Sequence, residues 1–386
     1  MRIMIVSGSV PPEPCGVGDH AARLAQELSE RDGVEVAILT SEWIKPEPQG
    51  KVAFFPVVKR GPGGLRAAFA SLAEWKPDIV HIQWPTQGYA FWHYKQNLLA
   101  PLLWLKGYPL VFSWHEPPTL ETLYPLAKRP WTVRSLTSWF RYATQRIWCD
   151  NWISSLLPGG LVLVRENFWQ LAPFWVRCLR WRKITIHVQN GPTLPKTRLA
   201  YSQLLKLRHK WTSEKKKIIL YFGFAFKHKG VHLVFDIADS SQHTLLIAFN
   251  RDPNDPYHAE LEELSRSGAW ADNAHLLGFL PGEDLANLIA LADAVVLPFT
   301  GGGGAWNTST MAVQNQGTLL VTTSQKKRGY VSEENTFYAA PGDIESLREG
   351  LRAYMARKSD GEGYGKAIWR RQVDDHIALY QKLRRP

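Results

Sequence analysis

Short apolar runs bounded by turn residues recur along the whole chain, and longer segments with helical spacing lie between them. The runs are continuous rather than alternating, which is typical of strands buried on both faces of a parallel sheet. Helical spacing of apolar residues is clearest at 21–31 and 65–75. This alternation predicts an α/β protein built from βαβ units. The expected strands are 3–6, 36–39, 54–58, 79–82, 110–114, 161–164 and 184–188 in the first half, and 218–222, 244–248, 275–277, 294–297, 318–322 and 337–339 in the second.

A polar, basic stretch at 197–217 follows Pro195 and separates the two series of strands. The simplest architecture is two doubly wound, Rossmann-like domains facing across a cleft. The pattern predicts a first domain over 1–196 and a second over 197–363. Aromatic and aliphatic residues at helical spacing over 368–383 predict a C-terminal helix within 364–386 that packs back onto the first domain and completes it.

The composition is that of a folded chain of several cores. Of 386 residues, 45% are hydrophobic and 21% are charged, which excludes wholesale disorder and a membrane bundle. No uncharged apolar stretch reaches 18 residues, so any membrane contact is expected to be peripheral. Three cysteines without paired spacing support neither a disulfide framework nor a zinc site, and they favour a cytoplasmic protein.

The charge is unevenly distributed along the chain. Lys and Arg number 46 against 35 Asp and Glu, and this net charge of +11 favours an anionic partner. Residues 128–183 alone hold ten Lys or Arg, two acids and seven Trp. This segment predicts a peripheral contact with anionic lipid at the inner face of the plasma membrane. The alternative is that the tryptophans fill a core behind a solvated basic face. No nucleic-acid-binding module is recognisable, so nucleic acid is not an expected partner.

A proline-rich loop that contains Gly16 and Gly18 follows the first strand and runs into a helix. Glycine lets the backbone approach a ligand closely, and the free N–H groups of a helix start attract anions. Residues 16–21 also match the dinucleotide fingerprint G-x-G-x-x-A, but that fingerprint requires its first glycine directly after the strand. A phosphate or sugar contact and a purely structural turn both remain open here.

His115 and Glu116 come directly after the strand at 110–114, and two prolines then direct the chain away. Ligand sites in open α/β sheets lie at the carboxyl ends of strands, which makes His115 a candidate functional residue. A histidine with a structural role is the alternative.

Two segments of the second half have the residue types of a phosphate site. Lys227 and Lys229 follow the strand at 218–222 and precede Gly230, and a lysine held against a diphosphate offsets the charge of a leaving group. Four glycines at 301–304 and the helix-cap types Asn307, Thr308 and Ser309 follow the strand at 294–297. Exposed loop lysines and a flexible glycine linker are the alternatives.

The order of these motifs is characteristic. The glycine loop, the strand-end His115, the Asn-Gly-Pro at 190–192, the glycine with Lys229-Gly230, the Leu-Gly-Phe-Leu at 277–280 and the Ala-Asp strand at 292–298 occur in sequence. In this respect the chain resembles the retaining GT-B glycosyltransferases of family 4, of the bacterial or cyanobacterial envelope and exopolysaccharide type. The resemblance implies a nucleotide-sugar donor on the second domain and an acceptor on the first.

The same resemblance implies roles for individual residues. His115 and Lys229 would be catalytic, at the donor sugar and at the diphosphate. Gly18 and Glu116 would lie on the acceptor side. The donor would be bound by Gly16, Lys227, Lys229, Phe279, Leu280, Gly303, Gly304, Asn307, Thr308 and Ser309.

The chain departs from the family pattern at three places. Phe224 stands where the family often has an arginine, and Lys227 is its expected substitute. The paired glutamates that usually contact the sugar and the ribose would fall on Gly304 and Ala312. The paired glycines of the first loop read Cys15-Gly16.

From these parts we expect a hexosyltransferase that uses a UDP-sugar, with UDP-glucose as the first candidate, and that extends an envelope polysaccharide, which can be lipid-linked. No Asp-x-Asp is present, and 252–255 read Asp-Pro-Asn-Asp, so neither a metal nor another cofactor is expected. The missing carboxylates support an alternative, a non-catalytic nucleotide-sugar-binding or scaffold protein of the same fold. An NAD-dependent oxidoreductase would be supported by residues 16–21 alone.

Overall fold

The chain folds into two units in the computed structural model, which describes residues 1–13, 15–46, 48, 50–59, 62–84, 99–115, 156–165, 168–172, 174–212, 216–304, 306–361 and 363–384. Unit 1 comprises Met1–Asn190 and Ile368–Pro386, and unit 2 comprises Gly191–Ala367. Each unit contains one seven-stranded sheet.

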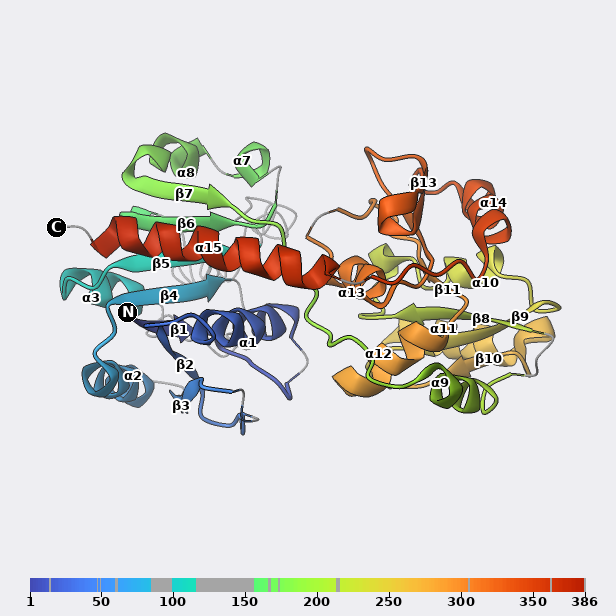
Figure 1. The fold of residues 1–386 in the computed structure, drawn as a ribbon, viewed down its shortest axis with the longest axis horizontal. Helices are drawn as coiled ribbons and strands as arrows, with labels where there is room; N and C mark the ends of the chain where they lie inside the picture. Colours follow the sequence, from blue (N-terminus) through green and yellow to red (C-terminus); the bar gives the residue numbers. More distant parts are fainter. Residues whose placement is uncertain are drawn as a thin grey trace, which may run out of the picture. The chain divides into compact units, whose positions relative to one another are not determined.

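The sheet of unit 1 has the order β3-β2-β1-β4-β5-β6-β7, and all its neighbouring strands pair in parallel. The chain moves outward from β1 to β3 and then returns to β4 on the other side, so the order reverses between β1 and β4 (Figure 1). Ligands bind beside such a reversal in open α/β sheets. The strands are β1 (Arg2–Val6), β2 (Glu35–Ser41), β3 (Ala53–Val58), β4 (Ile79–Trp84), β5 (Leu110–Trp114), β6 (Gly159–Leu163) and β7 (Lys183–His187).

Alternating side chains of these strands enter two separate cores. Helices α1 (Gly16–Ser29) and α15 (Tyr364–Arg384) cover one face, where Ile3, Val111 and Val162 meet Trp369 and Tyr380. The other face packs on α2 (Pro62–Trp75) and α3 (Leu99–Leu105). The remaining described helices are the short α7 (Phe168–Leu171) and α8 (Phe174–Cys178) and the 3-10 turn η4 (Arg180–Arg182).

The sheet of unit 2 repeats the plan, with the order β10-β9-β8-β11-β12-β14-β13 and a reversal between β8 and β11. All pairs are parallel except β13 with β14. Its strands are β8 (Lys217–Phe222), β9 (His243–Ala248), β10 (Ala274–Leu276), β11 (Ala294–Leu297), β12 (Leu320–Thr323), β13 (Gly329–Val331) and β14 (Thr336–Ala339). Its helices are α9 (Tyr201–Arg208), α10 (Leu233–Ile237), α11 (Pro256–Arg266), α12 (Gly282–Leu291), α13 (Thr308–Gln316) and α14 (Ile344–Tyr354).

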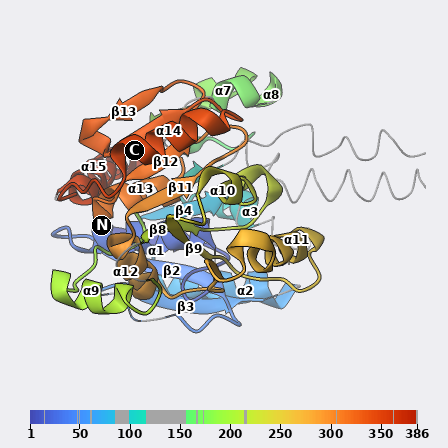
Figure 2. The same ribbon diagram turned by 90° about the vertical axis from the view of Figure 1, so that its right-hand side faces the viewer.

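The α/β prediction of two doubly wound sheets is confirmed, and every expected strand is present. The prediction missed β13, a three-residue antiparallel edge strand whose residues are all half-buried. The stretch at 197–217, which was expected to separate the two series of strands and to belong to the second domain, lies in unit 2 and contains α9, a helix that was not predicted. Helix α9 packs beside α12 (Figures 1 and 2), and the Arg208 guanidinium lies 2.7 Å from the Asp293 carboxylate at the start of β11. The units divide after Asn190, six residues before the expected boundary at 196.

The expected C-terminal helix is α15. It begins within unit 2, and from Ile368 on it belongs to unit 1. Trp369, Val373, Leu379 and Tyr380 are buried in the same core as α1. Residues near the C-terminus therefore cover part of one face of the sheet of unit 1.

Candidate functional site

In unit 2, the loops that follow β8 and β11 meet at the point where the strand order reverses. Gly230 adopts the left-handed conformation with φ 72°, and a Cβ added there would lie 2.2 Å from the Pro298 carbonyl oxygen. Only glycine permits so close an approach. The N–H and the hydroxyl of Thr300 both donate to the His228 carbonyl oxygen, each at 3.1 Å. The loops at 223–230 and 298–304 are therefore bonded to each other at the carboxyl edge of the sheet, and together they form what we call the joined surface.

Both predicted phosphate-site lysines lie on this surface, in the 3-10 turn η5 (Lys227–Lys229). Lys227 is exposed, whereas Lys229 is half-buried and holds its ammonium 5.1 Å from the centroid of the Phe299 ring. A cation over an aromatic face is attracted to it, and that attraction orients the Lys229 side chain. Phe224, which stands where the family has an arginine, stacks on Phe226 at 5.7 Å between centroids.

The glycine loop after β11 uses much of its own hydrogen-bonding capacity. The Gly303 N–H donates to the Thr323 carbonyl at 2.7 Å, and the Gly304 N–H donates to the Asn307 side-chain oxygen at 3.1 Å. Asn307 stands at the N-cap position of α13, but its side chain makes no bond to the helix. Asn307 is therefore at the expected N-cap position, but its carboxamide closes the glycine loop and does not bond to the helix.

The first turn of α13 remains as a source of amides for an anion. A helix start leaves N–H groups without intrahelical acceptors, and an anion placed there gains from the helix dipole. Thr308 and Ser309 stand in this turn, with two hydroxyls beside the backbone. We therefore expect an anion to contact Thr308 and Ser309, while Gly303 and Gly304 shape the loop.

The surroundings of Gly304 and Ala312 leave no room for the two glutamates of the family pattern. A Cβ added at Gly304 would lie 2.1 Å from the Trp306 ring, so any side chain at position 304 would collide with Trp306. Ala312 is buried in the core of unit 2. In this arrangement Trp306 occupies the space beside Gly304 that a glutamate would need.

Phe279 and Leu280 follow β10, which lies two strands away from β8 in the sheet. Gly278 before them is in the left-handed conformation with φ 72°. Phe279 is 56% exposed and Leu280 packs against the core of unit 2. Phe279 is therefore accessible to a ligand, whereas Leu280 also has a structural role.

In unit 1, His115 comes directly after β5, one strand beyond the reversal between β1 and β4. Its backbone N–H donates to the Trp84 carbonyl at 2.8 Å, and its Nε2 lies 3.0 Å from the Gln83 side-chain oxygen. The His20 ring meets it edge-on, with 5.0 Å between centroids. Burial lowers the pKa of His115 to about 4, so the ring is neutral at physiological pH.

The two glycines of the first loop differ in their surroundings. Gly16 is exposed at the start of α1, and nothing lies within 4 Å of a Cβ added there. Gly18 is buried, and a Cβ there would lie 2.6 Å from the Ser9 carbonyl oxygen. Gly16 is therefore open to a ligand, whereas Gly18 is required for packing of the loop on α1. Glu116 lies outside the described residues.

A cluster of buried imidazoles lies around His115 and was not predicted from the sequence: His20 on α1, His81 on β4 and His376 on α15. Burial, reinforced by the neighbouring rings, lowers the pKa of His20 and His81 well below the usual value, and burial lowers that of His376 to about 4. The available signal was the alternation of His81 and Gln83 within an apolar strand, which places both on one face of the sheet.

Asp19 was also missed. It stands in the first turn of α1, and burial raises the pKa of its carboxyl to about 7. Near neutral pH this group is therefore divided between its acid and its carboxylate forms.

Within the described part of the chain, no group of three or more His, Cys, Asp and Glu side chains is arranged to hold a metal ion. No described helix is both long and apolar enough to cross a membrane.

Comparison with known proteins assigns both halves of the chain to glycosyltransferase families. Residues 14–153 match the family model Glycosyltransferase Family 4, and residues 205–367 match the model Glycosyl transferases group 1. No significant match is found among curated proteins.

Solved structures with the same fold cover nearly the whole chain. Sucrose-phosphate synthase from Thermosynechococcus elongatus has a TM-score of 0.67 at 14% identity, over 99% of both chains. Anabaena HepE in complex with UDP-glucose has a TM-score of 0.64 at 15% identity, over 98% of this chain and 99% of that one. The catalytic domain of starch synthase IV from Arabidopsis thaliana, bound to ADP and acarbose, has a TM-score of 0.60 at 15% identity, over 99% of both.

Proposed function

Since this chain is a glycosyltransferase of the GT-B fold, we propose that it transfers a hexose from a UDP-sugar, with UDP-glucose as the first candidate, to a saccharide hydroxyl. The observation that carries the proposal is the joined surface of unit 2. There, the loop of Lys227 and Lys229 is bonded through Thr300 and His228 to the loop that leads into α13. Cations and a helix start at one strand-order reversal are suited to a diphosphate.

The chemistry follows from the charges that develop during transfer. Breaking the bond between sugar and diphosphate builds negative charge on the leaving phosphate and positive charge on the anomeric carbon. Lys229, already oriented by Phe299, stabilises the leaving phosphate together with the first turn of α13. The family resemblance implies that His115 contacts the donor sugar, and because its ring is neutral it would add no positive charge there.

Three finer features complete the proposal. Transfer proceeds with retention of the anomeric configuration, it needs no metal, and the acceptor is a growing envelope polysaccharide, which can be lipid-linked. Retention and the acceptor class rest on the family resemblance. The lysines and the helix start would supply the positive charge that a metal supplies elsewhere. The HepE structure that contains UDP-glucose supports the choice of the first donor to test.

Incubation with a panel of nucleotide sugars, with and without EDTA, tests this function. We expect UDP-glucose to bind and to be slowly hydrolysed to UDP and glucose at the same rate in EDTA. Loss of turnover in EDTA would contradict metal independence alone. Neither binding nor hydrolysis of any nucleotide sugar would contradict the whole proposal.

A second function is supported by Gly304 and Ala312, which lack the carboxylates of the family pattern. A non-catalytic protein of this fold would bind the nucleotide sugar and release it unchanged. Calorimetry that shows binding of UDP-glucose, together with no turnover on saccharide or lipid-linked acceptors, would favour this function over transfer.

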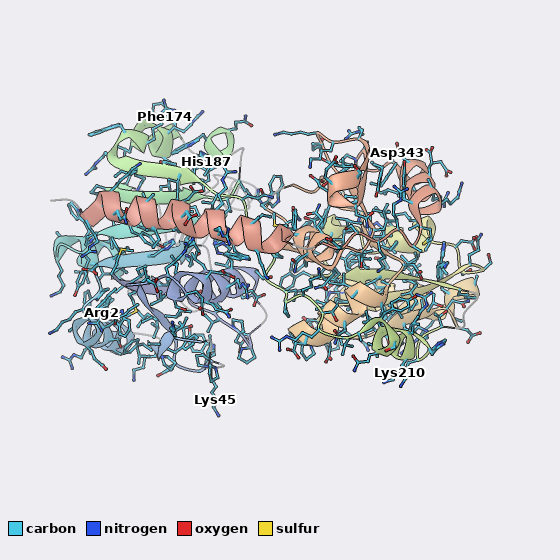
Figure 3. All side chains as sticks on the ribbon, in the orientation of Figure 1. Arg2, Lys45, Phe174, His187, Lys210 and Asp343 are labelled. Atoms are coloured by element: carbon cyan, nitrogen blue, oxygen red, sulfur yellow. The ribbon has the colours of Figure 1, made fainter. Side chains whose placement is uncertain are left out.

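We also propose that unit 1 contacts an anionic membrane from the cytoplasmic side. Among the described residues of 128–183, Phe174 is 71% exposed and Trp181 is 78% exposed. Arg177, Arg180 and Arg182 accompany them within α8 and η4. Figure 3 labels Phe174 at the margin of the unit. Apolar rings flanked by arginines suit the boundary between lipid headgroups and acyl chains.

A further inference from the structure

A chain of hydrogen bonds runs through the interior of unit 1 and ends at His115. His81 and Gln83 alternate on β4, and Ser113 lies beside Gln83 on β5, two residues before His115. Since side chains alternate along a strand, all four lie on the face that α1 and α15 cover. His81, Gln83 and Ser113 are fully buried. Buried polar groups normally require hydrogen-bond partners, and these four side chains serve as partners for one another.

The bond distances join these groups into one sequence. The Gln83 side-chain oxygen lies 3.0 Å from His115 Nε2, and the Gln83 side-chain nitrogen lies 3.2 Å from His81 Nε2. His81 Nε2 also lies 2.8 Å from the Ser113 hydroxyl. At the other end, His81 Nδ1 lies 2.7 Å from the Tyr380 hydroxyl on α15. Residues 299 positions apart in the chain are joined in this last bond.

With the Gln83 amide oriented as it is in the structure, these contacts have one direction of proton donation. The amide oxygen of Gln83 can only accept, so His115 donates from Nε2. The amide nitrogen can only donate, so His81 accepts at Nε2 and its single proton is on Nδ1, where it donates to Tyr380. The Ser113 hydroxyl must then donate to His81 Nε2. Rotation of the Gln83 amide by half a turn would reverse every one of these bonds together.

The rings of this cluster are neutral, so the tautomer is the variable that remains. Burial lowers the pKa of His115 to about 4, and it lowers the pKa of His81 well below its usual value. A neutral imidazole has one N–H and one lone pair. If Nε2 of His115 carries the proton, the lone pair is on Nδ1.

We propose that Gln83 is a positioning residue that holds His115 in the tautomer protonated on Nε2, so that Nδ1 offers a lone pair to a hydroxyl of the bound sugar. The role of His115 at the sugar rests on the proposed function. The tautomer rests on the hydrogen bonds alone. Tyr380 and Ser113 bond to the two nitrogens of His81 and hold its ring in place, while the Gln83 amide nitrogen determines its tautomer.

The first experiment measures the tautomer directly in the full chain. Long-range nitrogen–proton NMR of histidine-labelled protein distinguishes the two neutral forms of each ring, and the His115→Asn variant assigns the His115 signals. We expect a single form of His115 protonated on Nε2 and a single form of His81 protonated on Nδ1. The opposite pair of tautomers would overturn the proposal, as would a mixture at His115.

The second experiment removes the amide. Gln83→Met keeps the length of the side chain and loses both hydrogen bonds, so His115 should become a mixture of tautomers. Misorientation of a reacting group can cost roughly 100-fold in rate. We therefore expect kcat to fall by about 10- to 100-fold with little change in the KM for donor. Gln83→Glu restores the acceptor for His115 and should restore the single tautomer.

A matched control separates positioning from general stability. Thr40 is fully buried at the carboxyl end of β2, and its hydroxyl has no hydrogen-bond partner among the described residues. Thr40→Val should therefore change neither the tautomer of His115 nor kcat. Tyr380→Phe retains the packing and should disturb His81 first, which supplies a second variant if Gln83→Met does not fold.

These experiments distinguish a failure of the Gln83 proposal from a failure of the proposed sugar transfer. A chain that transfers no sugar but shows the expected tautomers, mixed in Gln83→Met, would refute the function and support the positioning of His115. An unchanged tautomer and an unchanged kcat in Gln83→Met would overturn the role of Gln83, whatever the donor.

Discussion

Units 1 and 2 share a strand order about a central reversal, yet they place opposite kinds of chemistry there. In unit 1, the residues at the carboxyl ends of β4 and β5 are buried, neutral imidazoles and an amide, with His115 at their edge. In unit 2, the loops after β8 and β11 carry an exposed lysine, a half-buried lysine and a helix start. The shared topology determines where a site forms, and the side chains determine what it can bind.

The two units should also differ in how their stability depends on pH. In unit 1 burial lowers the pKa of four histidines, whereas among the described residues of unit 2 a lowered pKa is found at one buried histidine, His243. A histidine whose pKa is lowered in the fold costs no stability while both the folded and the unfolded chain keep it neutral. As the pH falls, the unfolded chain binds the proton first, and this favours unfolding. Acid should therefore distinguish the units.

The largest expected effect is that acidic pH destabilises the fold of unit 1. For a histidine whose pKa falls from 6.5 in the unfolded chain to about 4 in the fold, stability is full above pH 6.5 and declines as the pH falls toward 4. Each such ring then costs about 3 kcal/mol, from about 1.4 kcal/mol per pKa unit. Hydrogen exchange, corrected for intrinsic rates, should show β4, β5 and α15 losing protection before β8 and β11.

Asp19 provides the control for this acid effect. Because its pKa is raised from 3.8 to about 7, Asp19 acts in the opposite sense, and its cost to the fold lessens as the pH falls. Asp19→Asn removes that compensation and should make unit 1 more sensitive to acid, whereas His376→Gln should make it less sensitive. Equal loss of protection in both units would contradict the assignment.

The second prediction concerns an ion pair in unit 2. The Asp293 carboxylate lies 2.7 Å from the Arg208 guanidinium and accepts from the Ile218 N–H at 2.7 Å, and it is buried. Asp293→Ala leaves the charge of Arg208 without a carboxylate, although the Leu291 and Lys216 carbonyls still accept from it, and this should lower the free energy of unfolding of unit 2 by about 3–5 kcal/mol. Denaturant unfolding of the two units measures this loss. Asp239→Asn, at an exposed acidic side chain of unit 2, is the matched control and should have little effect.

The strands of both units other than β13 could be predicted from the sequence, whereas β13 and α9, which carries Arg208 of this ion pair, could not. Continuous apolar runs predicted every strand buried on both faces, because such strands need no alternation. The stretch that contains α9 is polar and basic overall, and the few apolar residues that pack on the core of unit 2, Leu204, Leu207 and Trp211, do not form a clear helical pattern. For β13, three half-buried residues on an edge left too little pattern.

The site was predictable only to the level of loops. Glycines, lysines and a strand-end histidine indicated the segments, since residue types reflect the demands of a phosphate and of a close backbone approach. The bonds from His115 to Gln83 and from His81 to Tyr380 were not predictable, because they join β5 to β4 and β4 to α15 across long intervals of sequence. The engagement of the Gly303 and Gly304 amides within their own loop depends on backbone geometry that residue types do not determine.

The third prediction separates the chemistry of the two units. His115→Ala should lower kcat by about 100-fold and leave the Kd of UDP within a few-fold, since His115 is expected at the sugar. Lys229→Ala should weaken UDP binding by roughly tenfold and also lower kcat, since its charge acts on the diphosphate. Calorimetry and steady-state rates measure both. Lys210→Ala, at an exposed lysine after α9, is the control for loss of charge. If both site variants lose UDP binding equally, the division of roles between the units is wrong.

The smallest expected effect tests whether the exposed apolar and basic segment of unit 1 has a counterpart in unit 2. Trp181→Ala should reduce co-sedimentation with anionic vesicles by roughly tenfold, because an indole that enters the interface transfers part of its apolar area out of water. Raising the salt concentration should weaken binding further by screening Arg177, Arg180 and Arg182. Trp43, which is 44% exposed and lies outside this segment, provides the matched control, and Trp43→Ala should sediment like the unmodified chain. Equal sedimentation with neutral and anionic vesicles would contradict the role of the arginines, and no sedimentation at low salt would refute the membrane contact itself.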